Sequence, residues 1–327
     1  MLSELLLFTG KLVIFLVVAL GFLILALTLI AKAKEKLKDK LQIRNLSELY
    51  ADTKEKWLAE LLPAKAFKTF LKEKKQASKT AKRDETIHKS VFVMDFCGDM
   101  KASAVDGLSE MVTAILQVAK PDDEVILRLE SPGGVVHGYG LAAAQLMRLR
   151  ARNIYLTIAI DKVAASGGYM MACVANKIIA APFAIIGSIG VIVQLPNFHR
   201  LLKDKKVDFE QHTAGEFKRT ITVFGENTAA GREKLQEEIE AVHELFKKII
   251  QEHRQHLDIK KVATGEHWYG QQALGLQLID EIKTSDDLLL AANENATLYE
   301  VSYVQPKNLI SKLLGQAQET LSLLSLK

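Results

Sequence analysis

The sequence predicts an α/β fold in which βαβ units surround a mostly parallel sheet, preceded by an N-terminal transmembrane helix and a helical pre-domain. From residue 90 onward, short apolar runs rich in β-branched and aromatic residues alternate with helical patterns. Near the N-terminus, a long run of residues carries no charge. These observations divide the chain into an anchor (1–30), a basic helical pre-domain or stalk (31–88), an α/β domain (89–300) and a helical tail (301–327).

The predicted anchor is the uncharged run of residues 12–30, which read LVIFLVVALGFLILALTLI. Nineteen apolar positions match the length that a helix needs to cross a hydrocarbon core. A cleaved signal peptide is the alternative. Its apolar region is shorter and ends in small residues, whereas this run ends in Leu-Thr-Leu-Ile and is soon followed by lysines. A retained anchor is therefore favoured.

Positive charge is concentrated directly after the anchor. Residues 31–90 contain 17 lysines and arginines against 9 acidic residues, a net +8, whereas the whole chain carries only +4. Lysines beside a membrane set topology or contact anionic lipid more often than they bind nucleic acid. We expect membrane lipid as a partner and no nucleic acid. Within this segment, LSELYADTKEKWLAELL (46–62) predicts a helix that ends before Pro63, and 66–89 predicts a charged, partly flexible spacer.

The elements of the α/β domain follow from periodicity. Strands are predicted at 90–96, 124–130, 153–160 and 208–213, and helices at 105–120, 138–153 and 227–256, before a helix that returns to a strand over 268–282. The uncharged run 178–195 resembles a second membrane span. Its Pro182, Gly187 and Gly190 instead favour buried strands around a Gly-Ser-Ile-Gly turn, with VIVQL (191–195) as the second strand.

Three glycine-rich turns follow predicted strands: ESPGGVVHG (130–138), AASGGYM (164–170) and GSIGV (187–191). Ligand sites lie at the carboxyl ends of parallel strands, so these turns predict a site. Ser166 is the candidate nucleophile, because glycines follow it and the next helix would direct its N-terminal dipole at developing negative charge. The amides of Gly133, Gly134 and Gly167 are candidate oxyanion donors. The turn is not a GxSxG elbow, so the usual hydrolase triad is not indicated.

The base need not be a histidine, because a desolvated, neutral lysine can accept a serine proton. Lys218, in TAGEFKRT (213–220), is a candidate in a glycine-containing loop. Spacing alone does not select it from the other lysines. No metal-ligand spacing, P-loop or GxGxxG occurs in the sequence, so we expect no metal and no cofactor.

LRLESPGGVVHGYG, DKVAASGGYMMACVANKIIAAPFAIIGSIGV and TAGEFKRTITVF together resemble the signal peptide peptidase A family of serine proteases, peptidase family S49. The three motifs occur in the family's order, and the resemblance covers nearly the whole chain. It implies a ClpP/crotonase-like fold of βαβ superhelical turns, and assembly as a homo-oligomer. It assigns Ser166 as the nucleophile, Lys218 as the general base and Ser188 as a serine that hydrogen-bonds the lysine. It also places Gly133 and Gly134 in the region of the oxyanion hole and substrate strand.

The resemblance implies a membrane-anchored serine endopeptidase that uses a Ser-Lys dyad. Since this chain has a single repeat with both residues, each protomer could hold its own dyad. Peptides or unfolded proteins are the expected substrates, either signal peptide remnants or damaged envelope proteins. The alternatives are an inactive protease-fold membrane scaffold and a crotonase-like acyl-CoA enzyme, which also binds an oxyanion through backbone amides.

The expected location is the bacterial inner membrane. The lysines after the anchor favour a cytoplasmic catalytic domain by the positive-inside rule, whereas the family resemblance favours the periplasm. The sequence leaves these two topologies open.

Overall fold

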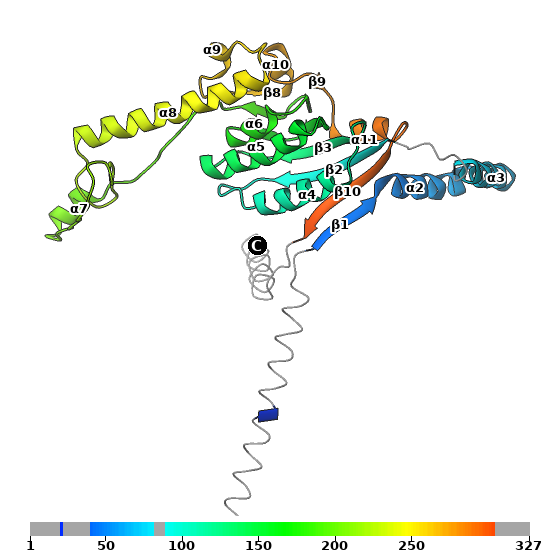
Figure 1. The fold of residues 1–327 in the computed structure, drawn as a ribbon, viewed down its shortest axis with the longest axis horizontal. Coiled ribbons are helices and arrows are strands. Elements are labelled where there is room, and N and C mark those ends of the chain that lie inside the picture. The colour runs from blue at the N-terminus through cyan, green and yellow to red at the C-terminus, as the bar shows by residue number, and fades with distance from the viewer. Residues whose placement is uncertain (1–19, 22–39, 82–88, 305–327) are drawn as a thin grey trace, which may run out of the picture. The chain divides into compact units, whose positions relative to one another are not determined.

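The structure, a computed structural model, describes residues 20–21, 40–81 and 89–304 of the chain (Figure 1). The predicted anchor, apart from Leu20 and Gly21, and the predicted tail beyond residue 304 lie outside these ranges. Within them, no helix is both long and apolar enough to cross a membrane. Residues Ile43–Ser302 form one compact unit, and the description below concerns that unit and the strand residues that extend from it.

Two sheets organise the described residues. The larger has the strand order β1-β10-β2-β3-β4-β6-β9, and the smaller has the order β5-β7-β8. The larger sheet contains β1 (Lys40–Asn45), β10 (Thr297–Val304), β2 (Ser90–Cys97), β3 (Glu124–Glu130), β4 (Tyr155–Ile160), β6 (Lys177–Ala180) and β9 (Glu281–Ile282). The smaller contains β5 (Val163–Ala165), β7 (Ile185–Gly187) and β8 (His267–Tyr269). From β10 to β9 every neighbouring pair of the larger sheet is parallel, as the βαβ pattern predicts.

Helices connect and cover the strands. They are α2 (Leu46–Leu61), α3 (Ala64–Ala81), α4 (Val105–Val118), α5 (Val136–Ala151), α6 (Gly167–Ala172), α7 (His199–Asp204), α8 (Ala229–His253), α9 (Ile259–Val262), α10 (Gly270–Gly275) and α11 (Ser285–Ala292). Helix α4 packs on α5, and α5 packs on α6. The mixed α/β class and the predicted strands and helices between residues 90 and 160 are confirmed.

The core lies on both faces of the larger sheet. Four successive residues of β2, Val91–Met94, are buried, as expected for a parallel strand that is covered on both sides. Val91 and Val93 share one face with Leu46, at the first position of α2, and with Leu289 of α11. The start of the predicted pre-domain therefore contributes to this core.

Two strand predictions were wrong, and one strand was missed. Residues 208–213 form no strand, because their mostly polar side chains are exposed and no neighbouring strand pairs with them. Residues 191–195 are also exposed rather than a buried strand. Conversely, β1 lies in a segment that was predicted to be helical. The first part of the 178–195 run does form strands β6 and β7, so the rejection of a membrane span there is confirmed.

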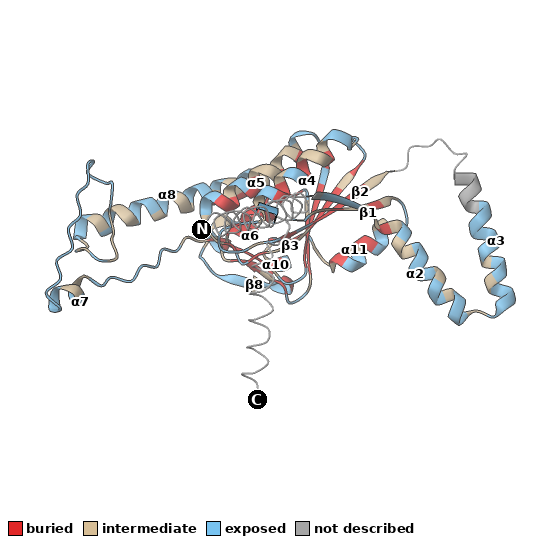
Figure 2. Ribbon diagram, turned by 90° about the horizontal axis from the view of Figure 1, so that it is seen from below, coloured by how far each residue is buried: buried red, intermediate tan, exposed pale blue. Residues whose placement is uncertain are grey.

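An extended segment joins β7 to α8, and we call residues 191–228 the arm. It includes α7 and folds beside the N-terminal half of α8 (Figure 1). None of its residues is buried, in contrast to the red core elements of Figure 2. It contains a cluster of rings in which Phe224 lies near both Phe198 and Phe209, with centroids 6.2 and 5.9 Å apart.

Candidate active site

The three glycine-rich turns meet because of strand pairing. Ser131, directly after β3, forms an isolated parallel bridge with Ala164 of β5. At the end of the β5–β7 pair, Ala165 lies opposite Gly187. Ser166 and Ser188 therefore follow paired residues at the carboxyl ends of adjacent parallel strands, which is where the sequence predicts a site.

Ser166 has a strained backbone. Its φ of 53° and ψ of −119° lie outside the regions that L-residues favour. The Ser166 amide donates to Gly187 O at 2.8 Å, and Ser166 O accepts from the Met170 amide at 3.0 Å. Its hydroxyl does not cap α6. Strain of this kind costs about 1–3 kcal/mol and concentrates at functional sites, where surrounding contacts enforce it.

The glycines beside Ser166 permit a close approach of two loops. A Cβ atom on Gly133, whose φ is +89°, would lie 2.7 Å from Gly167 N and 2.8 Å from Ser166 Cβ. A Cβ on Gly167 would lie 2.4 Å from Cγ of Tyr139. Only glycine fits at both positions, so the SPGG loop lies directly against the serine loop.

The amides of the SPGG loop are not equivalent. The Gly133 amide donates to Ser131 Oγ at 3.1 Å, and the Val135 amide donates to Met100 O at 2.9 Å. Within the described part of the chain, the amides of Gly134 and Gly167 have no hydrogen-bond acceptor. Of the three predicted oxyanion donors, Gly133 is thus already engaged, while Gly134 and Gly167 are available.

Ser188 lies beside the Ser166 loop. Its φ is 50°, and its amide donates to Glu266 O at 2.7 Å. Because the preceding residue, Gly187, accepts the bond from the Ser166 amide, one turn holds both serines. The structure brings Ser166, Ser188, Gly133, Gly134 and Gly167 together.

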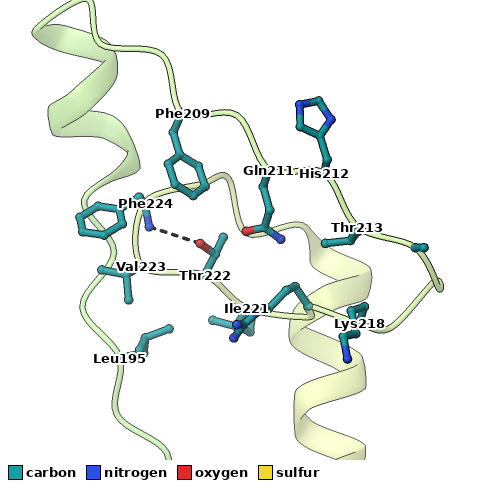
Figure 3. Close-up of a pocket in the computed structure, with 12 residues that line it drawn as sticks. Leu195, Phe209, Gln211, His212, Thr213, Lys218, Ile221, Thr222, Val223 and Phe224 are labelled. Carbon is teal, nitrogen blue, oxygen red and sulfur yellow. Dashed lines mark hydrogen bonds between the residues drawn. The ribbon is translucent and has the colours of Figure 1, made fainter.

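Lys218 is not part of this group. It lies on the arm, where its amide donates to Gly215 O at 3.2 Å, and its side chain is exposed. Figure 3 shows it at the edge of a hollow of about 690 Å³ that is lined by arm residues such as Leu195, Phe209 and Phe224. No hydrogen bond within residues 89–304 joins Lys218 to Ser166 or Ser188.

Two polar residues of the site were not singled out from the sequence. Ser131 and Tyr139 are fully buried and share a hydrogen bond of 2.7 Å behind the SPGG loop. In the sequence, Ser131 is the hydroxyl residue directly before Pro132, and Tyr139 is the fourth residue of α5. Without the fold, neither can be told from a residue that only fills the core.

The described residues contain no group of three or more His, Cys, Asp or Glu side chains that could hold a metal ion. The residues that the fold brings together supply two serines and backbone amides. They can provide the nucleophile and the oxyanion donors of acyl transfer, whereas the base that this reaction also requires does not lie among them.

Comparison with known proteins identifies the family. The model of the peptidase family S49 N-terminal region matches residues 1–146, and the model of peptidase family S49 matches residues 148–299. The chain belongs to peptidase family S49, a family of serine proteases, which confirms the resemblance that the three motifs indicated.

Two relatives share the description "Probable protease SohB". The one from Haemophilus influenzae is 60% identical over 230 residues, which are 70% of this chain and 65% of that protein, slightly under two thirds. The one from Buchnera aphidicola of Acyrthosiphon pisum is 47% identical over 316 residues, 97% of this chain and 94% of that protein.

Solved structures of the 1510-N membrane-bound stomatin-specific protease are also similar. One gives a TM-score of 0.42 at 16% identity and covers 63% of this chain and 85% of that one. A second, in complex with a substrate peptide, gives 0.45 at 14% identity and covers 72% and 100%.

Proposed function

We propose that this chain is a membrane-anchored serine endopeptidase in which Ser166 is the nucleophile and Lys218 is the general base. The observation that carries the proposal is the strained backbone of Ser166, held at the start of α6 beside two amides without acceptors in the described chain. A serine presented this way can attack a carbonyl whose oxygen is received by those amides.

The reaction is acyl transfer in two stages. Neutral Lys218 accepts the Ser166 proton while Oγ attacks the peptide carbonyl, and the amides of Gly134 and Gly167 donate to the oxyanion. The lysine then protonates the leaving amine, and the carbon–nitrogen bond breaks. In deacylation, the lysine takes a proton from water, which attacks the ester carbonyl. The lysine then returns this proton to Ser166 Oγ as the ester bond breaks, which restores the free enzyme. Ser188 orients the lysine through its hydroxyl.

The lysine comes from a second copy of the chain. Among residues 89–304, no hydrogen bond joins Lys218 to Ser166, and the arm that carries Lys218 has no buried residue. Its large apolar side chains remain accessible: Ile192 is 76% exposed, Leu201 53% and Phe217 52%. An unburied apolar segment of this size is typical of a protein interface. A homo-oligomer would cover it and bring Lys218 to a neighbour's Ser166.

The substrates are peptides or unfolded proteins, either signal peptide remnants or damaged envelope proteins. An extended chain can enter the Ser166 site between the SPGG loop and the arm of the second copy. The hollow beside Lys218 has a mixed lining, in which Leu195, Phe209 and Phe224 could receive apolar side chains of the substrate.

Residues 12–30 anchor the enzyme in the bacterial inner membrane. Helix α3 supports this, because Lys65, Lys68, Lys72 and Lys75 repeat at helical spacing and are exposed. Among the described residues, none of the four has an ion-pair partner, whereas Lys74 pairs with Glu55. We call these four residues the lysine stripe. Its charge is complementary to anionic lipid headgroups.

The test is peptide hydrolysis by the full-length chain in detergent, beside Ser166→Ala and Lys218→Ala, from pH 6 to 10. We expect a loss of at least about 10⁴-fold in both variants. Equal activity in all three proteins would refute the dyad. Turnover of acyl-CoA thioesters without peptide cleavage would favour the crotonase-like alternative. Retained cellular function in Ser166→Ala would favour the inactive scaffold.

Mixing the two variants tests whether Lys218 of one protomer acts with Ser166 of another. A Ser166→Ala protomer still has Lys218, and a Lys218→Ala protomer still has Ser166. Co-assembled, they should regain a fraction of wild-type activity. If mixed assemblies form but remain inactive, each protomer holds its own dyad.

A further inference from the structure

A buried chain of hydrogen bonds lies behind the SPGG loop. The Gly133 amide donates to Ser131 Oγ at 3.1 Å, Ser131 Oγ donates to the Tyr139 hydroxyl at 2.7 Å, and that hydroxyl donates to Asp99 O at 2.8 Å. Ser131 and Tyr139 are both 0% exposed. Every proton of the chain has an acceptor, and the final carbonyl can only accept, so the direction of the bonds is fixed.

The direction of these hydrogen bonds stays the same over the working pH range. Burial raises the pKa of the Tyr139 hydroxyl above its ordinary value, although the bond from Ser131 opposes the shift. The phenol therefore stays protonated and keeps donating to Asp99 O. Ser131 Oγ in turn has a lone pair free for the Gly133 amide.

The same two residues contact the loop of Ser166. The ring of Tyr139 lies against Gly167, where a Cβ would approach its Cγ to 2.4 Å. Ser131 O accepts from the Ala165 amide at 3.0 Å, and a Cβ on Gly168 would lie 2.5 Å from this oxygen. One buried pair thus touches both loops of the site.

The amide of Gly134 is held between two fixed neighbours. On one side the Gly133 amide is bonded to Ser131 Oγ, and on the other the Val135 amide is bonded to Met100 O. The intervening amide has no acceptor in the described chain. Catalytic donors act best when their orientation is set before the reaction, since no free energy is then spent on turning them.

We propose that Ser131 and Tyr139 are positioning residues that orient the Gly134 amide toward the oxyanion formed at Ser166. They touch no substrate, and act through the bond to the Gly133 amide. This inference rests on the proposed function. It assigns a role in the transition state to two hydroxyls that would otherwise only fill and satisfy the core.

The test compares Tyr139→Phe and Ser131→Ala with wild type in the full-length enzyme. Tyr139→Phe retains the ring against Gly167 and removes only the hydroxyl. Because a whole oxyanion donor contributes about 10²–10³ in kcat, misorienting one should lower kcat about 10- to 100-fold. KM should stay within about twofold, since ground-state binding is unchanged. Affinity for a peptide boronic acid, which forms a tetrahedral adduct with the serine, should fall by the same factor as kcat.

Tyr169→Phe is the matched control. Tyr169 is equally buried, and its hydroxyl donates to Leu278 O at 2.9 Å, away from the SPGG loop. This variant should lose similar thermal stability yet keep the wild-type kcat. A readout of stability alone would not separate the two tyrosines, whereas kcat and boronate affinity do.

The outcomes distinguish failure of the positioning role from failure of the proposed protease activity. An active wild type with unchanged kcat in Tyr139→Phe and Ser131→Ala would overturn this inference and leave the protease intact. Equal kcat losses in Tyr139→Phe and Tyr169→Phe would reduce the effect to general packing. An inactive wild type that binds no boronate would remove the proposed function, and the inference with it.

Discussion

Ser166, the proposed nucleophile, has a backbone conformation that lowers the stability of the fold. Its φ of 53° favours glycine, which has no Cβ to clash at positive φ. We expect the free energy of unfolding of Ser166→Gly to be about 1 kcal/mol higher than that of Ser166→Ala. We expect neither variant to be active. Urea denaturation measures the difference. At Ser109, in the middle of α4, the order should reverse, because glycine is about 1 kcal/mol worse than alanine in a helix. The same order at both positions would contradict a strained serine.

Gly133 carries a second prediction at the residue scale. In Gly133→Ala the new Cβ would lie within 2.8 Å of Gly167 N and Ser166 Cβ, at a φ of +89°. The two loops must separate, so we expect kcat/KM to fall at least about 100-fold. Gly140, on α5, offers open space instead, because a Cβ there would meet no neighbouring element within 4 Å. Gly140→Ala should keep full activity and gain about 0.5–1 kcal/mol of stability. Peptide hydrolysis by both variants checks this, and an active Gly133→Ala would refute it.

At the scale of elements, one ion pair joins the end of α8 to the strands. The side chain of Arg254 is only 4% exposed, and it donates to both carboxylate oxygens of Asp280 at 2.8 and 2.9 Å. Asp280 also accepts from the Ile178 amide of β6 at 2.7 Å. Burial alone would raise the pKa of Asp280, but these bonds outweigh it and the pKa lies below its ordinary value.

Asp280→Asn should therefore cost about 3 kcal/mol of stability at pH 7, because it leaves Arg254 buried without its partner charge. Since the folded pKa is lowered, the stabilisation is present above the unfolded value of about 3.9 and is lost as pH falls through the folded pKa. Urea unfolding from pH 8 to 3 should show a constant difference from wild type down to about pH 5, then a shrinking one. Glu237→Gln, at an exposed pair on α8, should change stability by less than about 0.5 kcal/mol. A pH-independent difference would contradict the assignment to Asp280.

The lysine stripe of α3 gives a prediction for the membrane. In lipid nanodiscs with anionic lipid, we expect the amides of α3 to exchange hydrogen more slowly than in neutral discs. Four lysines contribute on the order of 1 kcal/mol each near such a surface. Changing all four to glutamine, or adding about 0.5 M salt, should abolish the difference, because salt screens the attraction. Replacement of Lys260 and Lys261 on α9 is the control. Equal exchange in both kinds of disc would remove the lipid role.

At the scale of the whole molecule, topology can be read from the native cysteines. Cys97 is exposed, whereas Cys173 is fully buried and burial raises the pKa of its thiol to about 12. Only Cys97 should react with a maleimide. The positive-inside rule predicts a cytoplasmic domain, so an impermeant maleimide should label spheroplasts only after lysis. Labelling of intact spheroplasts, absent in Cys97→Ser, would place the domain in the periplasm instead.

The sequence predicted the parallel strands and helices between residues 90 and 160, because strand and helix periods alternate there without ambiguity. It also placed Ser166, Ser188 and the glycines at one edge, since carboxyl ends of parallel strands converge. It did not predict β1, a charged edge strand whose partner, β10, lies near the other end of the chain. Nor did it predict the exposed arm, because 191–195 has the composition of a buried strand, and only the fold shows that no residue between 89 and 304 buries it.

The engagement of Gly133 by Ser131 also depended on three-dimensional structure. From sequence, both glycines of SPGG were equivalent donors. Their difference arises from a hydroxyl two residues earlier and a tyrosine six residues later, held at the right distance by α5 and β3. Contacts of this kind depend on how elements pack, which local patterns do not encode.

The arm has a consequence for the control of proteolysis. If the proposed base of each active site comes from a second copy of the chain, a single protomer cannot hydrolyse a peptide. Newly made chains would be harmless to their neighbours while dilute, and specific activity would rise with protein concentration until assembly saturates. The number of enzyme copies in the membrane, rather than removal of an inhibitory segment, would then determine when the peptidase becomes active.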